Sequence, residues 1–498
     1  MSRFYCFGLQ RQYTLWAGIG LLTGTALLVI DSPLRALLIV AGLFFLVLIA
    51  IKPEVGVLTI VVLLSSIVFE ESLPLIPIGI GSFHLSDPIL LFMLGTMAFK
   101  AFAKGRQQYV RTPLDLPLAL FLVTVLISIC IAILQGQYRV DLGHILRQLR
   151  VVTYYLVVII ITNLIRSEEQ IRFVIRGLFV IAGTVVVTML IQGIIGESVQ
   201  LMPGRIEVAE TFGREYEALR MLPPGQTVIF FSLISAICVV VFREKNRSLL
   251  LSGYFHLILL LGIGVILTYN RHYWVGLLLA LCLLMVLMGT GSKKRLLALL
   301  VAVTILAGSI VALLGGSNTK VNKTFDAVSG RFISLFAGKK LTESGSLEDR
   351  YIESRYAIEQ IEKHPILGIG LGNTYRPQVF GLKEGLTYYI HNCYLWILTD
   401  TGLLGFIFFF LFYLRFIFRA MKNWKTIRVI FLKAVVVGFM ISGIVFLFMA
   451  IVTPIFMEWP VIVSISTMIG VTESIIRNCG INIEHTDNTS SAIGSGPV

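Results

Sequence analysis

The sequence has 498 residues, of which 56% are hydrophobic and only 14% are charged, and its mean hydropathy is +0.87. A soluble domain carries about 25% charged residues, so this composition excludes a soluble protein. Runs of about 20 apolar residues, long enough to cross the hydrocarbon core of a bilayer, recur along the whole chain. We therefore predict an all-α polytopic membrane protein.

The apolar runs predict twelve to fourteen transmembrane helices, and the simplest assignment has fourteen. Basic residues cluster in alternate connections, which places these connections and both chain ends on the cytoplasmic side. The polar residues 480–498, rich in Ser, Thr and Gly, predict a disordered cytoplasmic tail. The expected spans are 13–31, 34–51, 54–71, 88–103, 114–134, 149–165, 173–194, 226–242, 249–268, 273–289, 296–315, 394–418, 429–451 and 457–475.

Two connections on the opposite, external side are long, namely residues 195–225 and 316–391. Both carry many arginines and lysines, so we expect the external face to bind something anionic. Between Leu347 and Lys363 the apolar residues recur with the period of a helix, which ends at His364-Pro365. Such an amphipathic helix would lie on the membrane interface or over a cavity.

The motifs of nucleotide and metal sites are missing from the sequence. The six cysteines are scattered without metal-ligand spacing, and no zinc motif or Rossmann fingerprint occurs. The glycine run Gly368, Gly370, Gly372 follows no predicted strand and lacks the Lys-Ser/Thr of a phosphate loop, so it predicts a tight turn. We expect no cofactor, no metal and no nucleic-acid partner, and nucleotide-driven transport is disfavoured.

Four arginines are candidates for binding an anion. Arg271 stands at the external end of a span next to Trp274, where an arginine either anchors the helix or clamps a phosphate through its planar guanidinium. Arg220 precedes a Pro-Pro-Gly turn, and Arg205 and Arg214 lie in the same external loop. These three are ordinary loop charges, or they face Arg271 across a diphosphate.

His391 is the candidate for proton transfer. It is followed by Asn392 and then by an apolar run, so it lies at the start of a helix near the membrane surface. There an imidazole acts as a general base near neutral pH, and the helix N-terminus favours a phosphate leaving group. The alternative is a His-Asn pair that only caps the helix. His364 reads as structural, and Gly402 and Gly405 read as close helix-packing positions.

The sequence from His364 to Gly405 resembles a family signature. His391-Asn392, nine further residues and Gly402-Leu403-Leu404-Gly405 resemble the His-Asn…Gly-x-x-Gly pattern of O-antigen ligases and the related O-antigen polymerases. The upstream His364-Pro365-Ile366-Leu367-Gly368-Ile369-Gly370, and Arg271 and Arg220, resemble other parts of that family. The similarity covers about residues 200–420. Phe406-Ile407 stand where ligases often have Thr-Thr, so ligase and polymerase both stay open.

The resemblance implies a metal-independent, GT-C-like glycosyltransferase in the bacterial inner membrane, with its active site facing the periplasm. Its donor would be a glycan on undecaprenyl diphosphate. Its acceptor would be lipid A-core, a glycan or another hydroxyl compound for a ligase, or a second lipid-linked repeat for a polymerase. The other partners that the resemblance implies are membrane lipids and, as a candidate, a chain-length regulator. The alternative function is a transporter or flippase for a lipid-linked or anionic glycan.

The resemblance also implies roles for individual residues. Arg220, Arg271 and Arg214 would bind the diphosphate, and His391 would activate the acceptor hydroxyl. Asn392, Gly402 and Gly405 would support the acceptor or the structure. The implied organisation is an N-terminal transmembrane bundle (1–200), a ligase-like catalytic region (201–430), C-terminal transmembrane helices (431–479) and the tail (480–498).

Overall fold

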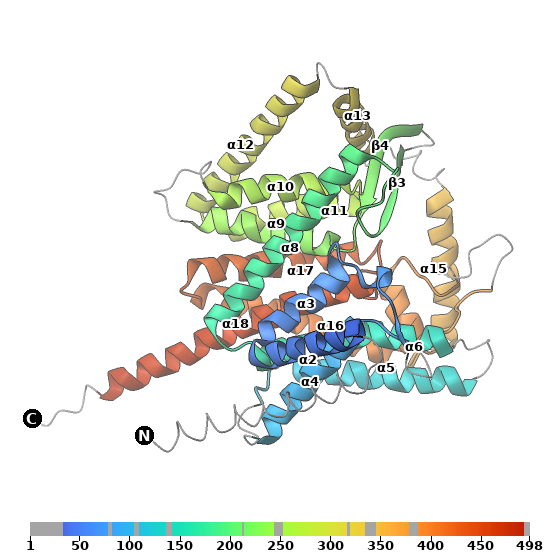
Figure 1. Ribbon diagram of the computed structural model, residues 1–498, viewed down its shortest axis with the longest axis vertical. Coiled ribbons are helices and arrows are strands. Elements are labelled where there is room, and N and C mark those ends of the chain that lie inside the picture. Colours follow the sequence, from blue (N-terminus) through green and yellow to red (C-terminus); the bar gives the residue numbers. More distant parts are fainter. Residues whose placement is uncertain are drawn as a thin grey trace, which may run out of the picture.

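The computed structural model describes residues 33–77, 82–103, 109–135, 142–211, 214–243, 252–315, 319–333, 345–377 and 387–492. Within them the protein is almost entirely helical (Figure 1). The helices of the first half are α2 (Pro33–Ile51), α3 (Pro53–Ser65), α4 (Ser86–Ala103), α5 (Asp115–Gln135), α6 (Leu142–Thr153), α7 (Val157–Leu164), α8 (Glu168–Ile195) and α9 (Gln226–Phe242). Those of the second half are α10 (Gly253–Leu267), α11 (Arg271–Leu287), α12 (Thr290–Gly315), α13 (Thr319–Ile333), α15 (Gly345–Lys363), α16 (Cys393–Asn423), α17 (Ile430–Met449) and α18 (Trp459–Ala492).

Six of the described helical spans are long and apolar enough to cross a membrane, and the bent pair α2–α3 makes a seventh if it is counted as one span. Three shorter apolar helices, α9, α10 and α11, lie where the sequence predicts spans eight to ten. The prediction of an all-α polytopic membrane protein is confirmed. The count of twelve to fourteen spans stays a prediction, because the first expected span, 13–31, lies outside the described residues.

α9, α17 and α18 are among the most deeply buried helices. All side chains of α9 from Thr227 to Val241 are buried, and α9 packs mainly on α17 and α10. A Cβ atom at Gly438 of α17 would lie 2.6 Å from the Cα atom of Ser235, so this glycine allows the two backbones to approach closely. α18 packs on α7 and α3 and continues to Ala492, so the described part of the predicted tail is helical.

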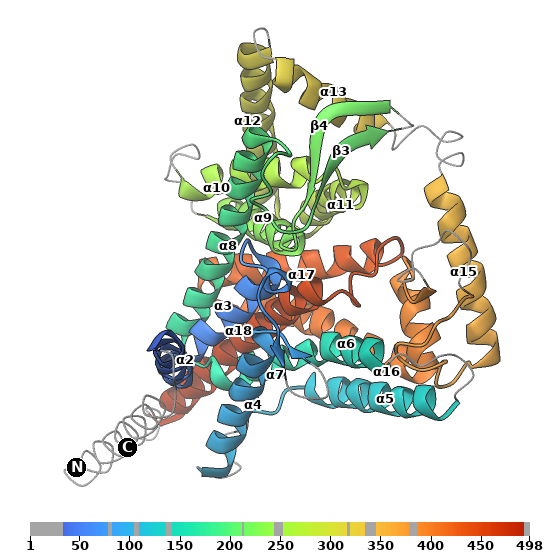
Figure 2. The ribbon, with the colours of Figure 1, turned by 45° about the vertical axis from the view of Figure 1, so that its right-hand side comes forward.

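Two antiparallel hairpins interrupt the helices. One is small, with β1 (Ile76–Pro77) and β2 (Ser82–Phe83), and it belongs to the connection between α3 and α4. The other, β3 (Arg205–Thr211) with β4 (Arg214–Leu222), lies in the connection 195–225, which the sequence analysis left without regular structure. Figures 1 and 2 place it beside α13, which the sequence analysis also did not predict.

The helix expected between Leu347 and Lys363 is present as α15, and it packs beside α16 (Figure 2). α16 is not continuous. Gly402 has φ +63° and ψ −167°, a conformation that breaks the helix and that glycine adopts without strain. The break frees backbone groups, and the glycine-rich segment satisfies them: Leu403 donates to Pro365, and Ile369 donates to Thr399. This segment is therefore fastened into the break.

Candidate active site

One large cavity, of about 1880 Å³, brings together residues from distant parts of the chain. Its walls come from α6, the β3–β4 hairpin, α11, α13, α15, the start of α16 and the connection between α17 and α18. Arg220, Arg271 and His391 all line it. The convergence of these three residues is what spacing in the sequence left undecided. The charged lining consists of Arg147, Arg205, Arg220, Arg271, Arg331, Arg350, Glu71, Glu207 and Glu458.

Arg220 is held at the base of the hairpin. Residue pairing in the sheet sets it opposite Glu207, and its Nη1 donates to Glu207 Oε1 at 2.5 Å. Its Nη2 donates to the Asn270 side chain at 2.8 Å, which joins the hairpin to the residue preceding α11. Burial lowers the pKa of Arg220, and the Glu207 carboxylate opposes this shift. Arg220 is thus a fixed, partly desolvated cation.

Arg271 is the first residue of α11, and its charged neighbours are Arg220 and Arg350. The Nε atoms of all three arginines are buried and have no hydrogen-bond partner within the described residues. Among the described residues, neither Arg271 nor Arg350 forms an ion pair with a carboxylate. Buried donors without a partner are costly. The cluster is therefore suited to a polyanionic ligand that accepts hydrogen bonds from several guanidinium groups.

His391 is oriented by a buried carboxylate that the sequence analysis did not single out. Its Nδ1 lies 2.8 Å from Glu353 Oε2, and its backbone N–H donates to the same oxygen at 3.2 Å. Glu353, on α15, is only 3% exposed, and Arg376 lies 3.8 Å from its other oxygen. Because a carboxylate only accepts, Nδ1 carries the hydrogen of this contact, and in the neutral imidazole Nε2 is then the nitrogen with the free lone pair. That arrangement is the one a general base requires.

Asn392 has a structural task at the same point. Its side chain accepts from the backbone N–H groups of Tyr394 and Leu395, so it is the N-cap of α16. This cap also determines where the helix starts relative to His391. A helix cap at Asn392 and a general base at His391 are compatible, since the two roles belong to adjacent residues.

Gly402 and Gly405 are not among the residues that line the cavity. A Cβ atom at Gly402 would lie 2.3 Å from the backbone of Ile366, and one at Gly405 would lie 2.1 Å from Thr401 Oγ1. We expected Gly402 to be a position where two helices pack closely, and this prediction is wrong. The glycine breaks α16 and packs against the loop residues Ile366 and Leu367 instead. A supporting role for Gly402 and Gly405 in the site stays a prediction.

The other two arginines of the connection 195–225 lie differently. Arg205 lines the cavity, but its side chain is 75% exposed and pairs with Glu207 at 2.7 Å. Arg214 is the first residue of β4, at the opposite end of that strand from Arg220. Its side chain lies outside the part of the chain that the structure describes. A diphosphate role for Arg214 therefore stays a prediction.

A second carboxylate faces the cavity beside the histidine. Tyr389 donates to Glu458 Oε1 at 3.2 Å, and its ring contacts His391 edge to face at 4.9 Å between centroids. Burial raises the pKa of the Glu458 carboxyl, and burial together with Glu458 raises that of Tyr389. Glu458 thus holds its proton more readily than an ordinary glutamate does.

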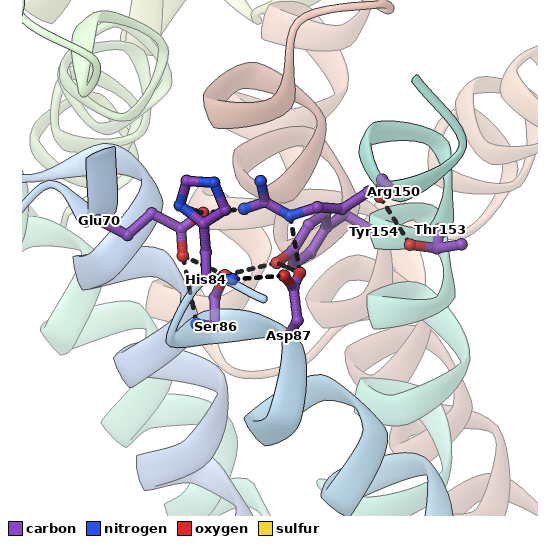
Figure 3. Close-up of polar contacts among 7 residues, drawn as sticks. All are labelled: Glu70, His84, Ser86, Asp87, Arg150, Thr153 and Tyr154. Carbon is purple, nitrogen blue, oxygen red and sulfur yellow. Dashed lines mark hydrogen bonds and ion pairs between the residues drawn. The ribbon is translucent and has the colours of Figure 1, made fainter. Parts of the chain in front are cut away.

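A buried polar network supports the wall of the cavity next to α6 (Figure 3). The Arg150 side chain bonds Glu70, and its Nε donates to Asp87 at 2.8 Å. The same guanidinium lies 4.1 Å from the ring centroid of Trp459, which lines the cavity. Burial raises the pKa of Glu70, while Ser86 and Arg150 oppose the shift. The network fastens the α3–α4 connection to α6 and holds Trp459 in place.

Within the described residues, no group of three or more His, Cys, Asp or Glu side chains is arranged to hold a metal ion. The arginines supply the positive charge of the described cavity lining.

The fold and the cavity define a multi-pass helical membrane protein with an arginine- and histidine-lined site. Residues 256–410 match a family model described as "O-Antigen ligase". This region contains Arg271, Arg350, Glu353 and His391 but not Arg220.

This match confirms, for residues 256–410, the resemblance to O-antigen ligases and polymerases. The match supports glycan transfer of the ligase or polymerase type and does not favour transport. No curated protein matches the chain.

Proposed function

We propose that the protein transfers a glycan from an undecaprenyl-diphosphate-linked donor to an acceptor hydroxyl on the external, periplasmic face of the bacterial inner membrane. The observation that carries this proposal is the meeting of Arg220, Arg271 and His391 in one cavity. Two positive groups and a base in one enclosure match the needs of a reaction with a diphosphate leaving group and a hydroxyl nucleophile.

The diphosphate would bind between Arg220, Arg271 and Arg350. Each guanidinium presents several N–H donors in one plane, a geometry that fits phosphate oxygens. As the bond between the sugar anomeric carbon and the phosphate oxygen lengthens, negative charge grows on the diphosphate. Fixed positive groups that surround this charge stabilise the transition state more than the ground state.

His391 would take the proton of the acceptor hydroxyl. The acceptor oxygen forms a bond to the anomeric carbon, the bond to the diphosphate oxygen breaks with its electron pair, and the proton goes to His391 Nε2. The products are the extended glycan and undecaprenyl diphosphate. Glu353 acts as a positioning residue, because it holds Nδ1–H and stabilises the imidazolium that forms. The arginines supply the charge, and the proposed reaction needs no metal.

An apolar part of the cavity suits the lipid portion of such a donor. Leu279, Phe448, Ile451 and Val452 line it, and the last three are exposed. Exposed apolar side chains that continue from a charged pocket are typical of sites for amphipathic ligands. An isoprenoid chain would lie there while its diphosphate reaches the arginines.

The acceptor decides whether the protein is a ligase or a polymerase. A ligase uses lipid A-core, a glycan or another hydroxyl compound. A polymerase uses a second lipid-linked repeat and can work with a chain-length regulator. Both reactions need the same donor site and the same base.

The test is transfer by the purified full-length protein in detergent or vesicles, with a lipid-diphosphate glycan donor, candidate acceptors and EDTA. We expect product with the native protein and a fall of about 10²- to 10⁴-fold for His391→Ala. His364→Ala, which changes a histidine that does not line the cavity, is the control and should keep transfer near the native rate. Donor movement across vesicles without product would favour the flippase alternative and sink the proposal.

A further inference from the structure

A second pocket, of about 810 Å³, lies away from the candidate active site between α8 and α10. Its floor and walls are largely apolar, with Phe179, Val180, Val187 and Leu257 among the lining residues. Arg176 and Arg243 lie at one end, and Tyr254 lies near both of them. The pocket is thus amphipathic: a long apolar groove with a basic end.

Among the described residues, the basic end carries more positive charge than neighbouring carboxylates neutralise. Arg172 pairs with Glu168 and therefore adds no net charge. Arg243 donates to the Ser252 hydroxyl, a neutral partner, at 2.7 Å. No ion pair of Arg176 or Arg243 with a carboxylate occurs within the described ranges. Two uncompensated guanidinium groups at the mouth of an apolar groove favour an anion with an apolar body.

The groove itself offers little polar recognition. The hydroxyl groups of Thr184 and Thr188 donate to backbone carbonyls of their own helix, Val180 and Thr184, so they are occupied. Gly183 lacks a side chain, and a Cβ atom there would meet only Leu260 Cδ2, at 3.7 Å. The glycine therefore leaves room in the middle of the groove. An extended acyl chain fits such a surface better than a sugar or a nucleotide does.

We propose that this groove is a binding site for an anionic phospholipid, with its phosphate between Arg176 and Arg243 and an acyl chain along α8 and α10. The sequence places both arginines on the cytoplasmic side by the distribution of positive charge. Basic pockets between helices on that side bind anionic head groups. The site is independent of glycan transfer and needs no activity for its test.

The experiment compares lipids on the purified, delipidated full-length protein, with binding measured by native mass spectrometry. The probes are phosphatidylglycerol, phosphatidylcholine of the same acyl length, and inorganic phosphate. We expect phosphatidylglycerol to bind the native protein at least about 10-fold more tightly than phosphatidylcholine. The double variant Arg176→Gln/Arg243→Gln should lose this preference. Lys422→Gln/Arg428→Gln, which removes two exposed charges elsewhere, should keep it.

Gly183→Leu tests the groove separately from the charge. A leucine there fills the apolar space, so it should weaken phosphatidylglycerol binding by a similar factor while leaving the thermal midpoint of the lipid-free protein near the native value. Equal binding of the two lipids by the native protein would overturn the proposal. So would an unchanged preference in the Arg176→Gln/Arg243→Gln variant. Full displacement of phosphatidylglycerol by inorganic phosphate would show a small-anion site instead.

Discussion

Glu353 Oε2 accepts two hydrogen bonds from one residue, His391: from the ring Nδ1 at 2.8 Å and from the backbone N–H at 3.2 Å. The carboxylate comes from α15 and the histidine from the residues just before α16, 38 positions further along the chain. Two bonds to one residue fix the ring and the main chain together. The imidazole of this cavity-lining residue is thereby held in one orientation.

Glu353→Gln should lower kcat for transfer by about 10²-fold while leaving KM for the donor within about twofold. Glutamine keeps the size of the side chain, but it lacks the negative charge that stabilises the imidazolium. Steady-state kinetics with varied donor concentration measures kcat and KM separately. Glu359→Gln is the matched control, because Glu359 lies on the same helix and pairs with Lys363 at the surface. Equal effects of the two variants would remove Glu353 from the mechanism.

Arg271→Gln should reduce kcat/KM for the donor by about 10²- to 10³-fold, because one of the groups that stabilise the developing diphosphate charge is lost. Arg271→Lys should recover only part of this loss, since an ammonium group lacks the planar pair of donors. The measurement is transfer at low donor concentration. Arg205→Gln, a change in an exposed cavity arginine already paired with Glu207, should stay within about threefold of native. An equal loss of kcat/KM in Arg271→Gln and Arg205→Gln would contradict a specific role for Arg271, because it would show only the effect of removing one positive charge from the cavity.

Gly402→Ala should destabilise the protein by at least about 2 kcal/mol. A non-glycine residue at φ +63° is strained, and the added Cβ atom meets the Ile366 backbone at 2.3 Å. Thermal unfolding in detergent gives the comparison. Gly262→Ala, in α10, has nothing within 4 Å of its new Cβ atom and should be neutral or slightly stabilising. A native-like midpoint for Gly402→Ala would show that the break in α16 is not required.

Glu70 should make stability depend on pH. Its pKa in the folded protein is raised above the ordinary value of 4.5, so the folded state binds the proton more tightly than the unfolded chain does. The stability that this provides is full below pH 4.5 and is lost as the pH rises towards the raised pKa.

Glu70→Gln removes this titration, so its thermal midpoint should change less than the native one across that window. Midpoints recorded at several pH values test this, and Glu168→Gln, at an exposed ion pair, should follow the native curve. Parallel curves for the native protein and Glu70→Gln would contradict the assignment.

The sequence predicted the positions of most helices, because an apolar run of membrane length has few alternatives. It also predicted α15 from its periodicity. The β3–β4 hairpin was missed although charged and apolar residues alternate along Arg205–Val208, a two-residue period typical of strands. The signal was present but short.

Glu353 was missed for a different reason. On an amphipathic helix a glutamate is expected to face water and an isoleucine to face the protein, yet Glu353 is 3% exposed and neighbouring Ile352 is 39% exposed. The buried face of α15 is set by its partner His391, which belongs to a segment remote in sequence. The convergence of Arg220 with Arg271 is likewise tertiary. It depends on the hairpin register and on Asn270, and no local pattern encodes either.

The hydrogen bonds between Glu353 and His391 cross a seam, meaning the contact between α15 and the segment that leads into α16. If the cavity admits a bulky lipid-linked glycan by parting this seam, the same movement takes the carboxylate away from the imidazole. Loading and reaction would then exclude one another in time, because the base is competent only while α15 lies against His391, as it does in this structure. While the cavity is open to water, His391 would lack its carboxylate partner and would be a poor general base. Water would then be activated less readily, and hydrolysis of the lipid-linked donor would be slower.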